Sequence, residues 1–98
     1  IYFASAMKNY FEKGMNELHA GNLDEAIELF TMEVDVNPQN AEAYFYRGKT
    51  FMQKGDTRLA LNDFYKTLEL NPNHNQAKVS IELINQIFSF RNPDIYNA

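Results

Sequence analysis

The sequence predicts an all-α fold in which antiparallel helix hairpins repeat twice and a single helix caps the C-terminal end. Residues 7–40 laid over 41–74 without a gap give 8 identities in 34 positions. A fixed period of this length is typical of a helical unit stacked on a copy of itself, because neither copy can bury its apolar side alone. The identical pairs are Tyr10 and Tyr44, Phe11 and Phe45, Gly14 and Gly48, Gly21 and Gly55, Ala26 and Ala60, Phe30 and Phe64, Asn37 and Asn71, and Pro38 and Pro72.

Glycines followed by polar residues mark the turn inside each unit. Gly21 and Gly55 are expected to end a first helix in the left-handed conformation, and Asn22 and Asp56 to cap the second helix. In the first unit, Asn22 and Glu25 predict an Asn variant of the capping box.

Prolines mark the end of each unit. Pro38 and Pro72 each follow an Asn and cannot continue a helix. Between these turns, apolar residues recur with the spacing of one side of an amphipathic helix, as Leu23, Ala26 and Phe30 do. The predicted helices span about 7–20, 23–36, 41–54, 57–70 and 75–90.

The second unit carries nearly the whole signature of a known repeat: Tyr44, Gly48, Phe51, Gly55, Ala60, Phe64 and Pro72. The chain resembles the tetratricopeptide repeat family, as a small bacterial-type member. Gly48 and Ala60 are then predicted to face each other where the two helices approach most closely. The first unit departs from the signature at Glu17 and Glu33, which suits a terminal repeat with one side in water.

The predicted organisation is a leader at 1–6, repeats at 7–40 and 41–74, a capping helix at 75–90 and a tail at 91–98. The leader resembles the remnant of an expression tag around a protease site, with Ala4 where that site has Gln; native sequence is the alternative. An ordered leader is expected either to extend the first helix or to dock Tyr2 or Phe3 on an apolar surface.

Charge and composition narrow the class of protein. The net charge is −4, and residues 7–40 carry two basic against seven acidic side chains. Because binding to nucleic acid needs a clustered basic surface, we expect no nucleic-acid partner. No apolar run approaches the ~20 residues of a membrane span, so we expect a cytoplasmic protein without a membrane segment. The chain has no cysteine, which excludes disulfides and thiolate metal sites.

No constellation of catalytic residues is evident, so the sequence predicts a non-enzymatic scaffold or adaptor without cofactor or metal. His19 and His74 are too far apart to be paired ligands, and each is expected to be a surface or capping residue. The neighbouring carboxylates Asp24, Glu25 and Glu28 are expected to lie on a solvated helix side.

The resemblance implies a concave groove lined by the first helix of each pair and by the last helix. Such a groove would bind a protein or peptide through an extended or helical apolar segment. Phe11, Phe45 and Leu83 are the expected anchors, and Lys49 is expected to meet an acidic or terminal group. Tyr44 is expected to face the core and Phe45 to project away from it. The full predicted lining is Phe11, Met15, Leu18, Phe45, Lys49, Met52, Val79, Leu83 and Ile87.

Three alternatives remain at this point. The groove could be buried in the interface of a homo-oligomer, it could be filled by the chain's own tail, or the chain could be an enzyme or enzyme subunit. Family members that grip the acidic end of chaperones use Lys, Asn and Arg in the groove. Here Phe11, Met15, Tyr46, Gln76 and Ser80 stand at those positions, so the resemblance does not carry that activity.

The last predicted helix has two apolar stripes. Ala77, Ile81, Ile84 and Phe88 form the stripe expected to cover the core of the second repeat. Val79, Leu83, Ile87 and Phe90 form the stripe that needs another cover.

Overall fold

The structure is a computed structural model that describes the backbone of residues 2–91 and the side chains of residues 10–89. All regular structure in residues 2–91 is helical, which confirms the all-α prediction. The five helices are α1 (Tyr2–Ala20), α2 (Leu23–Val36), α3 (Ala41–Lys54), α4 (Thr57–Leu70) and α5 (Asn75–Arg91).

The helix bounds match the sequence prediction closely, apart from the two outer ends. The backbone of residues 2–6 continues α1, which is one of the two outcomes expected for the leader. The other expected outcome was docking of Tyr2 or Phe3 on an apolar surface. These two side chains lie outside the described side chains. The side chain of Phe90 also lies outside them, as do residues 92–98 of the tail predicted at 91–98, whereas the backbone of Arg91 belongs to α5.

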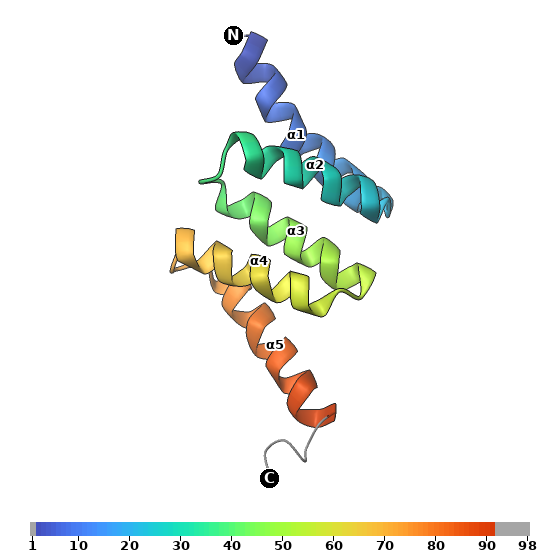
Figure 1. Ribbon diagram of the computed structural model, residues 1–98, viewed down its shortest axis with the longest axis vertical. Helices are drawn as coiled ribbons and strands as arrows, with labels where there is room; N and C mark the ends of the chain where they lie inside the picture. The colour runs from blue at the N-terminus through green and yellow to red at the C-terminus, as the bar shows by residue number, and fades with distance from the viewer. Residues whose placement is uncertain (1, 92–98) are drawn as a thin grey trace.

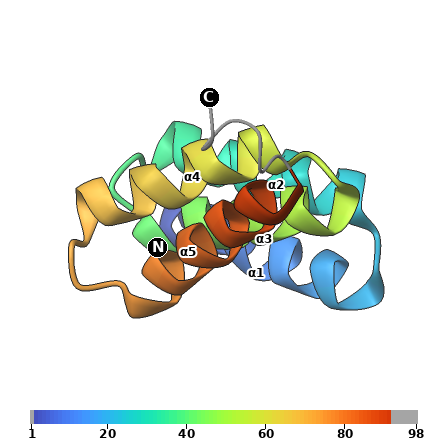
Figure 2. The same ribbon diagram turned by 90° about the horizontal axis from the view of Figure 1, so that it is seen from below.

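Each helix packs against the next in the chain, so the molecule is an elongated stack with α1 and α5 at opposite ends (Figure 1). Its dimensions are 58 × 28 × 18 Å. Seen from below, α2 and α4 lie along one side, and α1 and α5 along the other (Figure 2). This arrangement of alternating helices is the one that the repeat predicts.

A glycine in the first helix of each repeat lies directly against a phenylalanine ring of the second. A Cβ atom added at Gly48 would lie 2.8 Å from Cε1 of Phe64, and one added at Gly14 would lie 2.7 Å from Cε1 of Phe30. A Cβ at Gly48 would thus meet Phe64 first, and the close approach of Gly48 and Ala60 stays a prediction. Ala60 is fully buried, but the atoms nearest to Gly48 belong to Phe64 and Asp63.

The turns inside the repeats are confirmed, but their predicted caps are not. Gly21 and Gly55 have φ values of 84° and 98°, the left-handed conformation expected of them. Neither Asn22 nor Asp56 caps its helix with its side chain. The amide of Asn22 instead donates to Glu17 across the turn, at 2.7 Å, so the capping box with Glu25 is absent.

The caps made by side chains lie at the end of each repeat. Asn40 Oδ1 accepts a hydrogen bond from the backbone N–H of Ala43 at the start of α3, and His74 Nδ1 accepts one from Ala77 at the start of α5. His74 was expected to be a surface or capping residue. The capping role is confirmed, whereas the surface position is wrong because His74 is buried.

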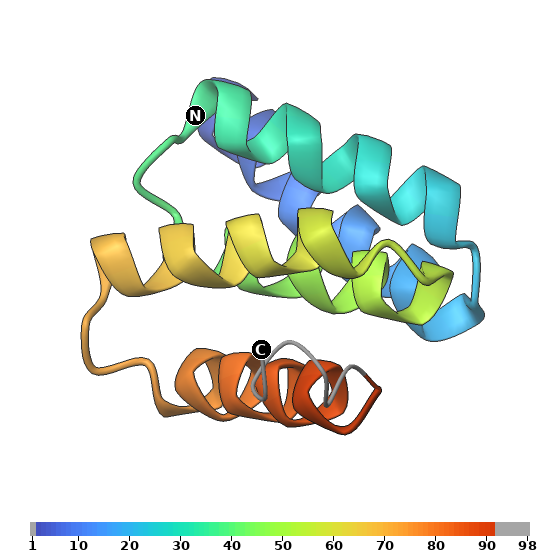
Figure 3. The ribbon, with the colours of Figure 1, turned by 60° about the horizontal axis from the view of Figure 1, so that its bottom comes forward.

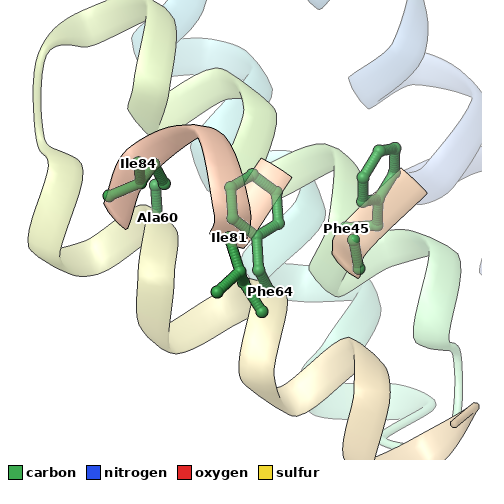
Figure 4. Close-up of a cluster of buried hydrophobic side chains, with 6 residues drawn as sticks. Phe45, Ala60, Phe64, Ile81 and Ile84 are labelled. Atoms are coloured by element: carbon green, nitrogen blue, oxygen red, sulfur yellow. The ribbon is translucent and has the colours of Figure 1, made fainter. Parts of the chain in front are cut away.

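The second repeat and α5 share one apolar core. It contains Phe45, Ala60, Phe64, Ala77, Ile81 and Ile84. Figure 4 shows Ile84 next to Ala60 and Ile81 beside Phe64, so the inner stripe of α5 covers this core as predicted. Phe88 is the exception, since it is 42% exposed.

An ion pair joins α3 and α4 within the second repeat, and a hydrogen bond from its arginine reaches the first repeat. The guanidinium of Arg47 donates to both carboxylate oxygens of Asp63, at 2.8 Å each, and to the hydroxyl of Thr31 in α2, at 3.2 Å. The hydrogen bond to Asp63 raises the pKa of Arg47, so the guanidinium stays charged. Burial raises the pKa of Asp63, and the bonds from Arg47 oppose that rise. The pair is therefore held by its hydrogen bonds against the cost of burial.

Candidate functional site

A cleft between α3 and α5 brings together three of the predicted groove residues. Lys49, Met52 and Leu83 line it, and its volume is about 210 Å³. Figure 3 shows α5 lying alongside the α3–α4 pair at the end of the stack. The complete lining of this cleft, called here the Lys49 cleft, is Lys49, Met52, Gln53, Phe64, Ser80 and Leu83.

A second hollow of about 200 Å³ adjoins the first, and Met52 lines both. Its other lining residues are Thr57, Ile84, Ile87 and Phe88, and it is called here the Ile87 hollow. Leu83 and Ile87 are one helical turn apart on α5. The two hollows therefore follow one another along this helix.

The outer stripe of α5 is open to water, as predicted for its described part. Val79 is 51% exposed, Leu83 53% and Ile87 47%. These residues recur every fourth position and thus lie on one side of the helix. Three large apolar side chains aligned along a water-exposed side of a helix are unusual. This surface is therefore a candidate for binding another molecule.

Lys49 is the cation of the Lys49 cleft. Its Nζ lies 5.7 Å from the centre of the Phe45 ring and 5.9 Å from that of Tyr46, within the range of a cation–π interaction. Within the described residues no carboxylate pairs with Lys49. The ammonium group is therefore positioned by aromatic rings and free to pair with an outside anion.

The part of the predicted groove in the first repeat is largely filled by the core. Leu18 is buried in the cluster around Phe30, and Phe11 and Met15 are half-buried against the same cluster. The ring of Phe11 lies 5.8 Å from that of Phe30 and 6.1 Å from that of Tyr46. The structure therefore does not bring these residues into the Lys49 cleft.

Phe45 is the clearest correction among the predicted groove residues. It is 2% exposed, its ring lies 5.7 Å from that of Phe64, and it also packs on His74. The sequence pattern treated Tyr44 as the core residue, but Tyr44 is half-buried and lies under the cations of Arg47 and Lys66. Tyr44 carries a hydroxyl that needs water or a hydrogen-bond partner, whereas Phe45 has no polar atom to satisfy, so full burial suits Phe45 better.

Three lining residues, Gln53, Phe64 and Ser80, are missing from the predicted lining. Phe64 was assigned to the core, and it is indeed 1% exposed, yet it also forms the floor of the Lys49 cleft. Ser80 was considered only as a departure from the chaperone-binding pattern. Its position three residues before Leu83 on α5 is the signal that could have placed it on the same side of the helix.

The described side chains offer no site for metal chemistry. No group of three potential ligands among His, Asp and Glu gathers anywhere within residues 10–89. His74 Nε2 lies 2.8 Å from Glu42 Oε2. Because Nδ1 of the same ring accepts from Ala77, Nε2 carries the proton and donates to Glu42. Both ring nitrogens of His74 therefore have hydrogen-bond partners within the chain.

Comparisons with known proteins point to one repeat family. Residues 41–74 match the family model of the tetratricopeptide repeat. DnaJ homolog subfamily C member 3 of Bos taurus is 33% identical over 73 residues, which cover 74% of this chain and 14% of that protein. Tetratricopeptide repeat protein 6 of Homo sapiens is 37% identical over 60 residues, which cover 58% of this chain and 12% of that protein.

The solved structures agree with this fold. The crystal structure of MamA superposes with a TM-score of 0.83 at 21% identity, covering 92% of this chain and 53% of the MamA chain. The present chain therefore spans about half of that structure and less than one sixth of the two relatives above. In the part of the chain described, no helix combines the length and apolar character that crossing a membrane requires.

Proposed function

The chain belongs to the tetratricopeptide repeat family, and we propose that it is a non-enzymatic protein-binding module that contacts its partner through the Lys49 cleft. The fold of this family provides surfaces for protein–protein interaction. That the partner binds between α3 and α5 is part of the proposal, and the geometry of the Lys49 cleft supports it.

One observation carries this proposal: Leu83, 53% exposed, forms the rim of an apolar cleft whose floor is Phe64. Covering apolar surface releases water and is favourable at roughly 25 cal/mol per Å². A cleft of about 210 Å³ has room for about one large side chain, so the contact is short. We therefore expect weak to moderate affinity.

The test uses Leu83→Glu, because Leu83 is exposed and the variant should fold. The neighbouring Glu82→Gln, also exposed but outside the cleft lining, is the matched control. Proteins captured by the wild-type chain and by the control, and lost with Leu83→Glu, would support the proposal. Equal capture by all three would contradict it. Phe45→Glu is unsuitable, because a buried charge at that position would unfold the chain.

A homo-oligomer is the second candidate, and the outer stripe of α5 favours it. Val79, Leu83 and Ile87 form a straight apolar ridge that two copies could pair around a twofold axis. Sedimentation over a range of concentrations tests this candidate. A dimer that dissociates in Leu83→Glu would support it, and a monomer at every concentration would exclude it.

A further inference from the structure

We propose that the partner segment is an amphipathic helix with two large apolar residues four positions apart and an acidic residue beside the first of them. This inference rests on the proposed function, because it describes the partner of the same surface. The two hollows, the polarity of their walls and the charge of Lys49 support it independently.

The two hollows define two apolar anchors. Their volumes of about 210 and 200 Å³ are below the roughly 300–1,000 Å³ of small-molecule sites, so each suits a single side chain. Leu83 lines the first hollow and Ile87 the second, about 6 Å apart along α5 at ~1.5 Å per residue. Apolar residues at positions i and i+4 of a partner helix have the same separation.

The walls of the hollows favour a helix over an extended peptide. A helix satisfies its own backbone groups, whereas an extended peptide needs hydrogen-bond partners along its length. The Lys49 cleft offers only Lys49, Gln53 and Ser80 as polar side chains, and the Ile87 hollow offers only Thr57. The exposed ridge of α5 also suits the packing of helix ridges into grooves.

Lys49 fixes the position of the acidic residue. Lys49 lines the first hollow but not the second, and no described carboxylate neutralises its ammonium group. An Asp or Glu on the partner, one turn before the first anchor and away from the second, would reach it. The charge therefore sets the direction in which the partner lies along α5.

The experiment uses labelled synthetic peptides of about 15 residues, near the length at which isolated helices become stable. The reference peptide carries Leu at i and i+4 and Glu at i−4, and fluorescence anisotropy reports its binding to the full chain. Replacing Glu by Lys should weaken binding about five- to tenfold, the effect of one partly exposed charge pair and its reversal. Lys49→Glu should invert this preference, so that the Lys peptide binds more tightly.

Lys78→Glu is the matched control, since Lys78 is exposed on α5 but lines neither hollow. It should leave the preference for the Glu peptide unchanged. Circular dichroism of each variant establishes that it is folded, and Lys49→Met replaces Lys49→Glu if the latter is not.

Three results would overturn the inference. The first is equal binding of the Glu and Lys peptides. The second is equal or tighter binding of a peptide of the same composition with Leu at i and i+2 and a central Pro. The third is no binding of any peptide; if proteins are still captured in a Leu83-dependent way, the inference fails while the proposed function stands.

Discussion

The two repeats pack their helices alike but stabilise them with different polar groups. In both, a glycine lies under a phenylalanine ring, Gly14 under Phe30 and Gly48 under Phe64. The ion pair of Arg47 and Asp63 has no counterpart in the first repeat. Apolar packing is thus shared by the two copies, whereas the polar contacts depend on the place of each copy in the stack.

The residues that replace the ion pair in the first repeat are Lys13 and Leu29. Lys13 is exposed, and Leu29 lines an acidic hollow of about 250 Å³ between α1 and α2. Within the described residues the first repeat packs against the second repeat, and Lys13 lies at the surface. Arg47 lies between α2 and α4 and can bond to both, which only an inner repeat allows.

The largest expected effect is that of removing Arg47. Arg47→Leu leaves the carboxylate of Asp63 buried without its partner and should lower the free energy of unfolding by about 3–5 kcal/mol. The double variant Arg47→Leu with Asp63→Leu should recover most of that loss, because both charges are gone. Urea denaturation of the three proteins measures the difference.

Lys13→Leu is the control for this prediction, and it should change stability by less than about 0.5 kcal/mol. Similar losses for Lys13→Leu and Arg47→Leu would show that the two repeats do not differ at this position. A double variant as unstable as Arg47→Leu alone would show that the pair itself, and not an unpaired charge, is responsible.

The second prediction concerns the feature that the repeats share. Gly14→Leu and Gly48→Leu should each cost roughly 1–3 kcal/mol, because the new side chain must displace a phenylalanine ring. Thermal unfolding measures both variants, with the exposed Gln53→Leu as the control. If only one of the two variants lost stability, the glycine–phenylalanine contacts of the two repeats would not be equivalent.

The smallest expected effect concerns the caps at the end of each repeat. Asn40 and His74 occupy equivalent positions 34 residues apart, and each accepts the N–H of the third residue after it. Asn40→Ala should cost about 1 kcal/mol. His74→Ala should cost somewhat more, because His74 also packs on Phe45. His74→Asn keeps an acceptor and should lose less than His74→Ala; the reverse order in urea denaturation would refute the capping role.

Much of the fold could be predicted from local signals. Gly21, Gly55, Pro38 and Pro72 end helices through their own backbone chemistry, so the helix bounds follow from the sequence. The caps could not be predicted as well. Asn22 has the right residue type for an N-cap but donates instead to Glu17, and competition between such hydrogen bonds depends on the tertiary structure.

The candidate site was predicted only in part, because neighbouring aromatic residues compete for the core. Lys49, Met52 and Leu83 were placed correctly along one cleft by their helical positions. Tyr44 and Phe45 were exchanged, since a helix period does not decide which of two adjacent rings is buried. The hydroxyl of Tyr44 favours the half-buried position, where the ring contacts Arg47 of the next turn and Lys66 of another helix.

The aromatic rings that fill the first-repeat part of the groove have a consequence for how the chain unfolds. Phe30, Phe11, Tyr46, Phe45 and Phe64 form a continuous row with ring centres 5.1–6.1 Å apart. This row leaves no plane at which one repeat could separate while the other keeps its core. Nearest-neighbour coupling in the stack is therefore strong, and the two hairpins should melt as one cooperative unit. Among the described side chains, those of α5 beyond Ile84 are exposed, so this part of the helix should fray more readily than the core.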